Sequence, residues 1–125
     1  MQSTKRSIML CPIELGGAIL IINYNKLVRD KIPEIIRIIG DTPKTMTLDD
    51  ETYFHCLNQK LKEEVDEYLE ECSACELADI LEVIYAIAAY KNLTPSDLEN
   101  IRLKKHDERG GFSDKVFLVE VEREV

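Results

Sequence analysis

Residues 62–81 read KEEVDEYLEECSACELADIL, and this stretch decides the fold. It contains two acidic motifs, EEVDE at Glu63–Glu67 and ELAD at Glu76–Asp79, each inside a segment whose apolar residues recur with a helical period. Only eight residues separate Glu67 from Glu76, which suits two antiparallel helices joined by a short turn. The stretch therefore predicts a helical hairpin.

The two motifs place carboxylates in pairs. Residues three apart share a helix face, with Cβ atoms about 5–6 Å apart, so Glu64 pairs with Glu67 and Glu76 with Asp79. Folding the hairpin would bring both pairs together, where carboxylates repel one another and lose hydration. An oxygen-only ligand set suits a hard divalent cation such as Mg²⁺, which bridges to substrate phosphates. The pattern thus predicts metal-dependent phosphate chemistry.

Most acidic runs are solvated helix faces or helix-capping acids, and that interpretation suits three residues here: Asp66, Glu70 and Glu71. It suits Glu64 poorly, because Glu64 lies three residues after Leu61 and four before Tyr68, on the apolar stripe. It suits Asp79 still less, because its sequence neighbours are apolar. These two residues carry the metal hypothesis.

The composition fits one globular domain. The chain has 125 residues, with 45% hydrophobic and 32% charged residues. Its net charge of −8 argues against broad nucleic-acid binding, because phosphate backbones bind to basic surfaces. The four cysteines follow no disulfide-scaffold spacing, which indicates a reducing, cytoplasmic setting. Cys72 and Cys75 are interpreted as small residues at a helix turn.

Residues 1–22 are interpreted as an N-terminal extension of a domain that spans residues 23–125. Lys5 and Arg6 precede an apolar stretch, which superficially resembles a signal peptide. Glu14 interrupts that stretch, no clear cleavage site follows it, and it is short for a membrane span. We expect a cytosolic extension; the alternatives are a targeting segment and an extra element that packs on the core.

Helical periods and capping signals predict four helices, at about residues 33–39, 50–71, 74–91 and 95–109. The third is apolar on nearly every side from Leu77 to Ala89, so we expect it to be the buried central helix. Lys115–Val121 alternates and predicts a strand, with Ile19–Ile22 as its nearest partner. The expected fold is all-α, an antiparallel helical bundle with a short C-terminal strand.

Two basic segments are candidates for binding phosphate. One is KKHDERGGF, with Lys104, Lys105 and Arg109. The helix macrodipole alone would favour cations there, and glycine is an ordinary helix stop. The other segment contains Arg29 and Lys31, which from the residues alone are equally well explained as surface charges.

Four stretches occur in a specific order: YNKLVRDKIPEII at 24–36, EExxE at 63–67, ExxD at 76–79 and KKHDERGGF at 104–112. Together they resemble the MazG-like branch of the all-α nucleoside triphosphate pyrophosphohydrolases. More narrowly, they resemble the small phosphoribosyl-ATP pyrophosphohydrolase-like proteins. The resemblance covers roughly residues 23–120, although ExxD alone would carry little.

The resemblance implies an oligomeric helical bundle that binds Mg²⁺, or Mn²⁺ in its place. It implies hydrolysis of a nucleoside triphosphate substrate to monophosphate and pyrophosphate. Carried over by position, the metal ligands are Glu64, Glu67, Glu76 and Asp79, and the catalytic acids are Glu63 and Glu64, with Glu63 outside the ligand set. The spacer between the acidic motifs is shorter here than in many MazG proteins, and the N-terminal extension is unusual.

Three functions remain open from the sequence. The leading one is a house-cleaning nucleotide pyrophosphohydrolase; the second is phosphoribosyl-ATP pyrophosphohydrolase of histidine biosynthesis, with the same chemistry and a different base-side pocket. The third is a non-catalytic helical adaptor, against which buried acids on two facing helices argue. An apolar central helix that one subunit cannot cover predicts a homodimer or homotetramer. Neither nucleic acid nor a membrane is an expected partner.

Overall fold

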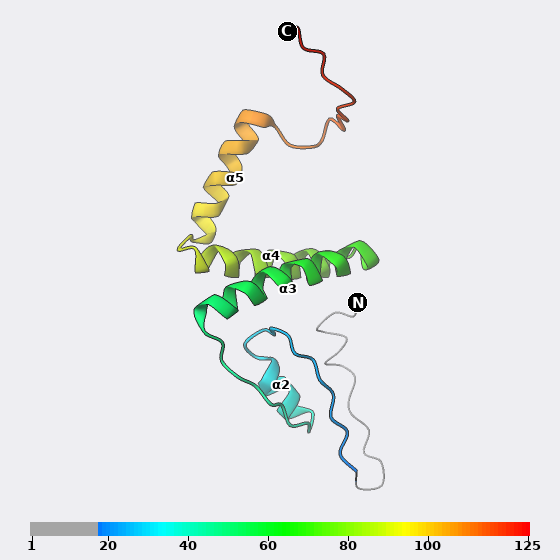
Figure 1. Cartoon of the computed structure of the whole chain (residues 1–125), viewed down its shortest axis with the longest axis vertical. Helices are drawn as coiled ribbons and strands as arrows, with labels where there is room; N and C mark the ends of the chain where they lie inside the picture. Colours follow the sequence, from blue (N-terminus) through cyan, green and yellow to red (C-terminus); the bar gives the residue numbers. More distant parts are fainter. Residues whose placement is uncertain (1–17) are drawn as a thin grey trace.

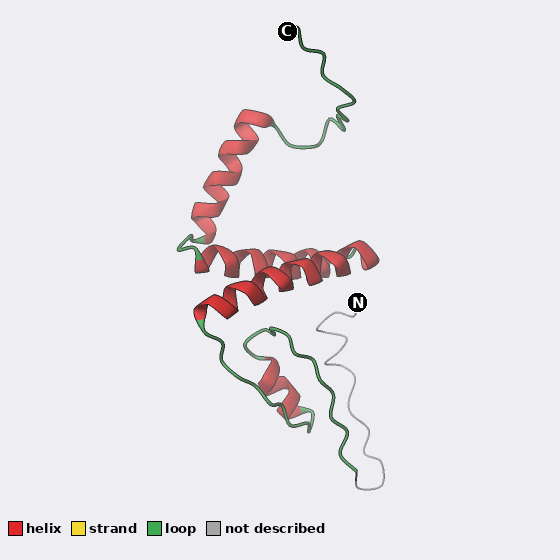
Figure 2. Cartoon of the chain, in the orientation of Figure 1, coloured by secondary structure: helices red, strands yellow, loops and turns green. Residues whose placement is uncertain are grey.

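The computed structural model describes residues 18–125, and these are helices joined by loops (Figure 1). No strand is drawn in this part of the chain (Figure 2). The helices are α2 (Ile32–Ile38), α3 (Asp50–Glu71), α4 (Ala74–Tyr90) and α5 (Pro95–Arg109). The all-α class is confirmed, and each predicted helix is present with its ends shifted by no more than one residue.

α3 and α4 form the predicted hairpin because the first ends and the second begins within two residues. Cys72 takes a left-handed conformation with φ of 52°, which ends α3. The side chain of Ser73 then accepts a hydrogen bond from the amide of Glu76 at 3.4 Å and so caps α4. At the other end of α3, Asp49 accepts from the amide of Thr52 at 2.8 Å. The two helices consequently lie side by side (Figure 1).

The interior of the hairpin changes character along its length. Away from the turn it is apolar: Leu57, Val83 and Ala88 are buried, and the ring of Phe54 stacks on Tyr90 with centroids 4.6 Å apart. Toward the turn, the buried positions of both helices are carboxylates. The same packing that forms the core therefore also draws the acids of α3 and α4 inward.

α5 leaves the hairpin at the end opposite the turn and runs away from it (Figure 1). A capping box formed by Thr94 and Asp97 starts the helix, and Gly110, with φ of 82°, ends it. No residue of α5 is buried, and residues 101–110 are all exposed. The C-terminal half of α5 is thus open to solvent along its length.

The strand expected at Lys115–Val121 is not formed. This segment has no regular secondary structure, and its apolar side chains are exposed. The suggested partner, Ile19–Ile22, is likewise exposed and lies in no strand. A strand gains its hydrogen bonds only from a neighbour, and no neighbour reaches this segment within the described chain. The prediction is corrected to an irregular segment.

The expectation that α4 is buried on nearly every side is also corrected. Leu77, Leu81 and Tyr85 recur every four residues and form one stripe that is exposed by 51%, 45% and 37%. We call these three residues the α4 stripe. Among the described helices, α3 packs along α4 and α5 makes only a few contacts with it, and a single neighbouring helix covers only one face. The opposite face therefore meets solvent in the isolated chain.

The interpretation of residues 1–22 as an N-terminal extension concerns residues that lie largely outside the described part of the chain, which begins at position 18. Among the helices that are described, none combines the length and the apolar character needed to cross a bilayer.

Candidate metal centre

Three of the four predicted ligands meet inside the hairpin near its turn. Glu64 of α3 and Glu76 and Asp79 of α4 each offer a carboxylate oxygen, and these atoms all lie within 4.8 Å of one another. All three residues are buried, with 4%, 5% and 8% of their surface exposed. Glu67, the fourth predicted ligand, lies one turn further along α3 and is fully buried. The predicted convergence of the acidic motifs is therefore present.

The cluster is electrostatically strained. Burial raises the pKa of Glu76, and a hydrogen bond with Glu71 and the negative charges of Asp79, Glu67 and Glu71 raise it further. Such carboxylates lack the hydration that stabilises their charge. A cation bound among these acids would lower the repulsion further.

Two oxygens in the cluster remain without a hydrogen-bond donor among residues 18–125. They are Oε2 of Glu64 and Oε2 of Glu76, both shielded from solvent. A buried acceptor without a donor costs about 1–3 kcal/mol. Hard, oxygen-only ligands with unsatisfied lone pairs are what Mg²⁺ coordinates in proteins. The residues present thus fit a divalent cation.

Cations from an earlier segment of the chain surround the acids. Arg29 donates to Asp79 at 2.7 Å and lies 3.8 Å from Glu82. Lys26 donates to Glu63 at 2.9 Å. The segment before α2 is therefore docked on the hairpin by charge, over sequence separations of 37 and 50 residues. Arg29, a candidate for binding phosphate, thus lies beside the acids.

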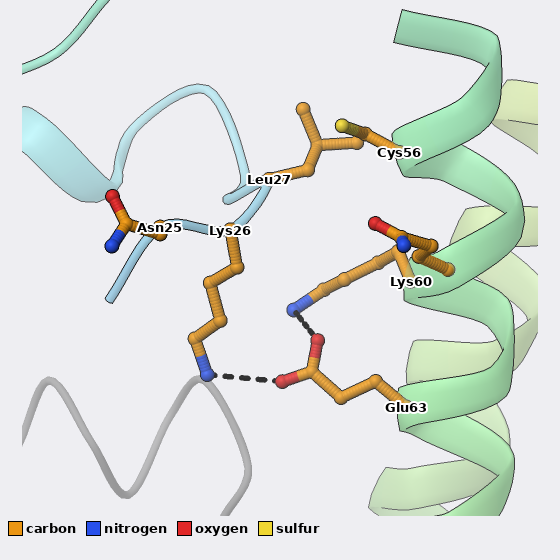
Figure 3. Close-up of a pocket in the computed structure, with 7 residues that line it drawn as sticks. Asn25, Lys26, Leu27, Cys56, Lys60 and Glu63 are labelled. Carbon is orange, nitrogen blue, oxygen red and sulfur yellow. Dashed lines mark hydrogen bonds and ion pairs between the residues drawn. The ribbon is translucent and has the colours of Figure 1, made fainter. Parts of the chain in front are cut away.

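Glu63 stands beside the cluster and is held by two lysines (Figure 3). Lys26 approaches one carboxylate oxygen at 2.9 Å and Lys60 the other at 3.0 Å, and Lys60 also lies 3.3 Å from Glu64. Burial raises the pKa of Glu63, but the hydrogen bonds and charges of the two lysines outweigh it, so the pKa is lowered. Glu63 therefore remains a carboxylate at neutral pH.

Sequence reasoning missed both lysines. Lys60 carried a local signal, because it precedes Glu63 by three residues and Glu64 by four on the same helix face. Nothing in the sequence around Lys26 distinguishes it from an ordinary surface lysine. It becomes part of the site only because its segment docks on α3.

The other predicted phosphate-binding residues lie away from the acids. Lys31 is exposed, next to the start of α2. Lys104, Lys105 and Arg109 are exposed near the C-terminal end of α5, which points away from the hairpin (Figure 1). Within one chain, the structure does not bring the basic end of α5 to the carboxylates. The thiols of Cys72 and Cys75 are free and exposed at the hairpin turn.

Comparisons with known proteins find a relative that matches part of the chain. No protein-family model matches the chain, and no solved structure matches it. An uncharacterized protein of Mycolicibacterium smegmatis (strain ATCC 700084 / mc(2)155) is 55% identical over 42 residues, which are 34% of this chain and 43% of that protein. The match thus spans less than half of this relative. Its name states no activity, so the resemblance to MazG-like proteins stays a prediction.

Proposed function

We propose that this protein is a Mg²⁺-dependent nucleoside triphosphate pyrophosphohydrolase, a MazG-like enzyme that cleaves between the α and β phosphates. The observation that carries the proposal is that buried Glu64, Glu76 and Asp79 each offer a carboxylate oxygen within 4.8 Å of the others, inside the α3–α4 hairpin. The order of the motifs along the chain, which resembles that family, supports it independently. Mn²⁺ is expected to substitute for Mg²⁺.

The residues divide into roles by position. Glu64, Glu67, Glu76 and Asp79 would hold the ion, which supplies charge neutralisation for the phosphates and a more acidic water. Glu63 lies outside the three converging oxygens and is kept ionised by Lys26 and Lys60. A carboxylate there can orient the attacking water, directly or through the ligand acids. Arg29, beside Asp79, can offset charge on the phosphates.

A panel of nucleoside triphosphates tests the proposal, with Mg²⁺ present and pyrophosphate release as the readout. Phosphoribosyl-ATP belongs in the panel, because the histidine-biosynthesis enzyme would use the same acids with a different base-side pocket. Turnover of at least one member that stops in excess chelator is the expected result. Metal binding without turnover of any member would instead favour the non-catalytic adaptor, although burial of the acids argues against a partner-binding surface.

Arg109→Ala is expected to lower kcat/KM about tenfold or more and to leave thermal stability nearly unchanged. A charge-assisted phosphate contact is worth about 1.5–3 kcal/mol, whereas an exposed helix-end cation contributes below about 1 kcal/mol. Because Arg109 lies far from the acids of its own chain, this contact requires a second subunit. Arg102→Ala, on the same helix and paired with Glu99, is the matched control. Unchanged kinetics with a lower melting temperature would make Arg109 a structural helix-end cation.

A homodimer or homotetramer is expected at micromolar concentration. The α4 stripe exposes large apolar side chains in a row, and a second copy would cover them. Sedimentation should therefore give more than one subunit per particle. Leu81→Glu should shift the particle toward monomer, whereas Met46→Glu, in the loop before α3, should not. A wild-type monomer at this concentration would contradict the prediction.

A further inference from the structure

A small cavity lies where residues 25–27 meet α3, directly beside Glu63 (Figure 3). Its volume is about 70 Å³, and its lining consists of Asn25, Lys26, Leu27, Cys56, Gln59, Lys60 and Glu63. We call it the lysine pocket. Sites for whole small molecules measure about 300–1,000 Å³, whereas one water occupies about 30 Å³. The lysine pocket therefore fits one tetrahedral oxyanion and is too small for a base with its sugar.

Charge in the lysine pocket depends on the state of the neighbouring acids. The ammonium groups of Lys26 and Lys60 converge on the two oxygens of Glu63 (Figure 3). Lys60, which is 8% exposed, also reaches Glu64 at 3.3 Å. Two lysines thus balance two carboxylates in the chain alone. A divalent cation at Glu64 would compete with Lys60 for that carboxylate, so more of the Lys60 charge would be available to an anion in the lysine pocket.

Donors for an anion are present in the lysine pocket. An ammonium group has three N–H donors, and among the described residues Lys26 forms one hydrogen bond, to Glu63. Gln59, whose side chain carries an amide donor, also lines the pocket. Lysine acts as a point charge toward phosphate and needs no fixed fork geometry.

We propose that the lysine pocket binds one phosphate group of the substrate, and of the pyrophosphate product, with Lys26 and Lys60 as its cations. The inference rests on the proposed function and locates a phosphate subsite within a single chain. Lys60 connects this subsite to the metal centre, because its ammonium group spans Glu63 and Glu64. Occupation by phosphate is consequently coupled to occupation of the acids by Mg²⁺.

Calorimetric titration of the full chain tests the inference, with Mg²⁺ alone first and then inorganic pyrophosphate in excess Mg²⁺. Lys26→Ala should bind pyrophosphate about tenfold more weakly or worse, because one charge-assisted hydrogen bond is lost. Its affinity for Mg²⁺ alone should not fall. Lys44→Ala removes the same charge from an exposed loop position and should bind pyrophosphate as the wild type does. Lys26→Arg should recover part of the affinity, because it restores a cation.

The outcomes separate this inference from the proposed function. Failure of the wild type to bind Mg²⁺ would overturn the proposed function itself. Normal Mg²⁺ binding, with Lys26→Ala and Lys44→Ala equal in pyrophosphate affinity, would overturn the lysine pocket alone. Weaker Mg²⁺ binding or a lowered melting temperature in Lys26→Ala, with no specific loss of pyrophosphate affinity, would make Lys26 a structural counter-ion of Glu63 and would also overturn it.

Discussion

Glu64→Gln and Asp79→Asn should each abolish triphosphate hydrolysis while the protein remains folded. Both substitutions keep the shape of the side chain and remove the charge that would hold the cation. Mutating residues that only support the ligands of a metal typically lowers metal affinity or activity about 10–100-fold. Loss of a direct ligand should therefore lower the rate of hydrolysis by more than about a hundredfold. Each variant relieves repulsion among the buried carboxylates but also loses an ion pair, Glu64 with Lys60 or Asp79 with Arg29, so the melting temperature should change little.

The matched control for these variants is Asp66→Asn. Asp66 lies on α3 next to Glu67, but its side chain is 36% exposed and pairs with Lys62 at 2.8 Å. An exposed pair of this kind contributes about 0.2–1 kcal/mol or less, so this variant should retain activity. Rates are measured by pyrophosphate release and folding by circular dichroism. Full activity of either ligand variant, or of the wild type in excess chelator, would remove the metal hypothesis.

Magnesium should stabilise the protein, most strongly at neutral pH and above. Free Mg²⁺ at about 100 times its dissociation constant adds about 2.7 kcal/mol to the free energy of unfolding, which raises the melting temperature by about 10 °C or more in a chain of this size. In chelator, the repulsion that raises the pKa of Glu76 remains. Thermal unfolding with and without Mg²⁺, across a range of pH, measures both effects.

The sign of the pH dependence follows from Glu76. Its pKa is raised in the folded state from the ordinary 4.5, first by burial and then by neighbouring acids. Above pH 4.5 the folded chain therefore binds more protons than the unfolded chain, and the free energy of unfolding falls as the pH rises through the raised pKa. Glu63 has the opposite effect, at acidic pH. Its pKa is lowered in the folded state, so its contribution to the free energy of unfolding is lost only as the pH falls below 4.5.

Glu76→Gln isolates this effect. In chelator at neutral pH the variant should melt at a higher temperature than the wild type, because the group that is disfavoured as an anion is now neutral. It should also lose the stability gained from Mg²⁺, because a ligand is gone. Greater stability of the wild type than of Glu76→Gln in chelator would show that the acids are satisfied without a metal.

The hairpin and the register of its acids are determined by the sequence itself. The signals that form it are local in the chain. They are the helical period of the apolar residues, the capping residues Asp49 and Ser73, and the two-residue turn. Spacing along α3 and α4 then fixes which carboxylates face inward, so the sequence alone predicts that Glu64, Glu76 and Asp79 lie together. The capping box and glycine stop of α5 are local in the same sense.

Only the tertiary structure decided what surrounds that hairpin. Lys26 and Arg29 reach the acids across 37 and 50 residues, and no local pattern specifies which distant segment will dock there. Exposure of the α4 stripe and the missing strand at Lys115–Val121 likewise depend on which neighbours are present. The basic end of α5 was expected near the phosphates, but the direction in which α5 leaves α4 carries it away (Figure 1). Local hydrogen bonds and side-chain periods set each helix, whereas the placement of cations around the acids depends on packing between segments far apart in the chain.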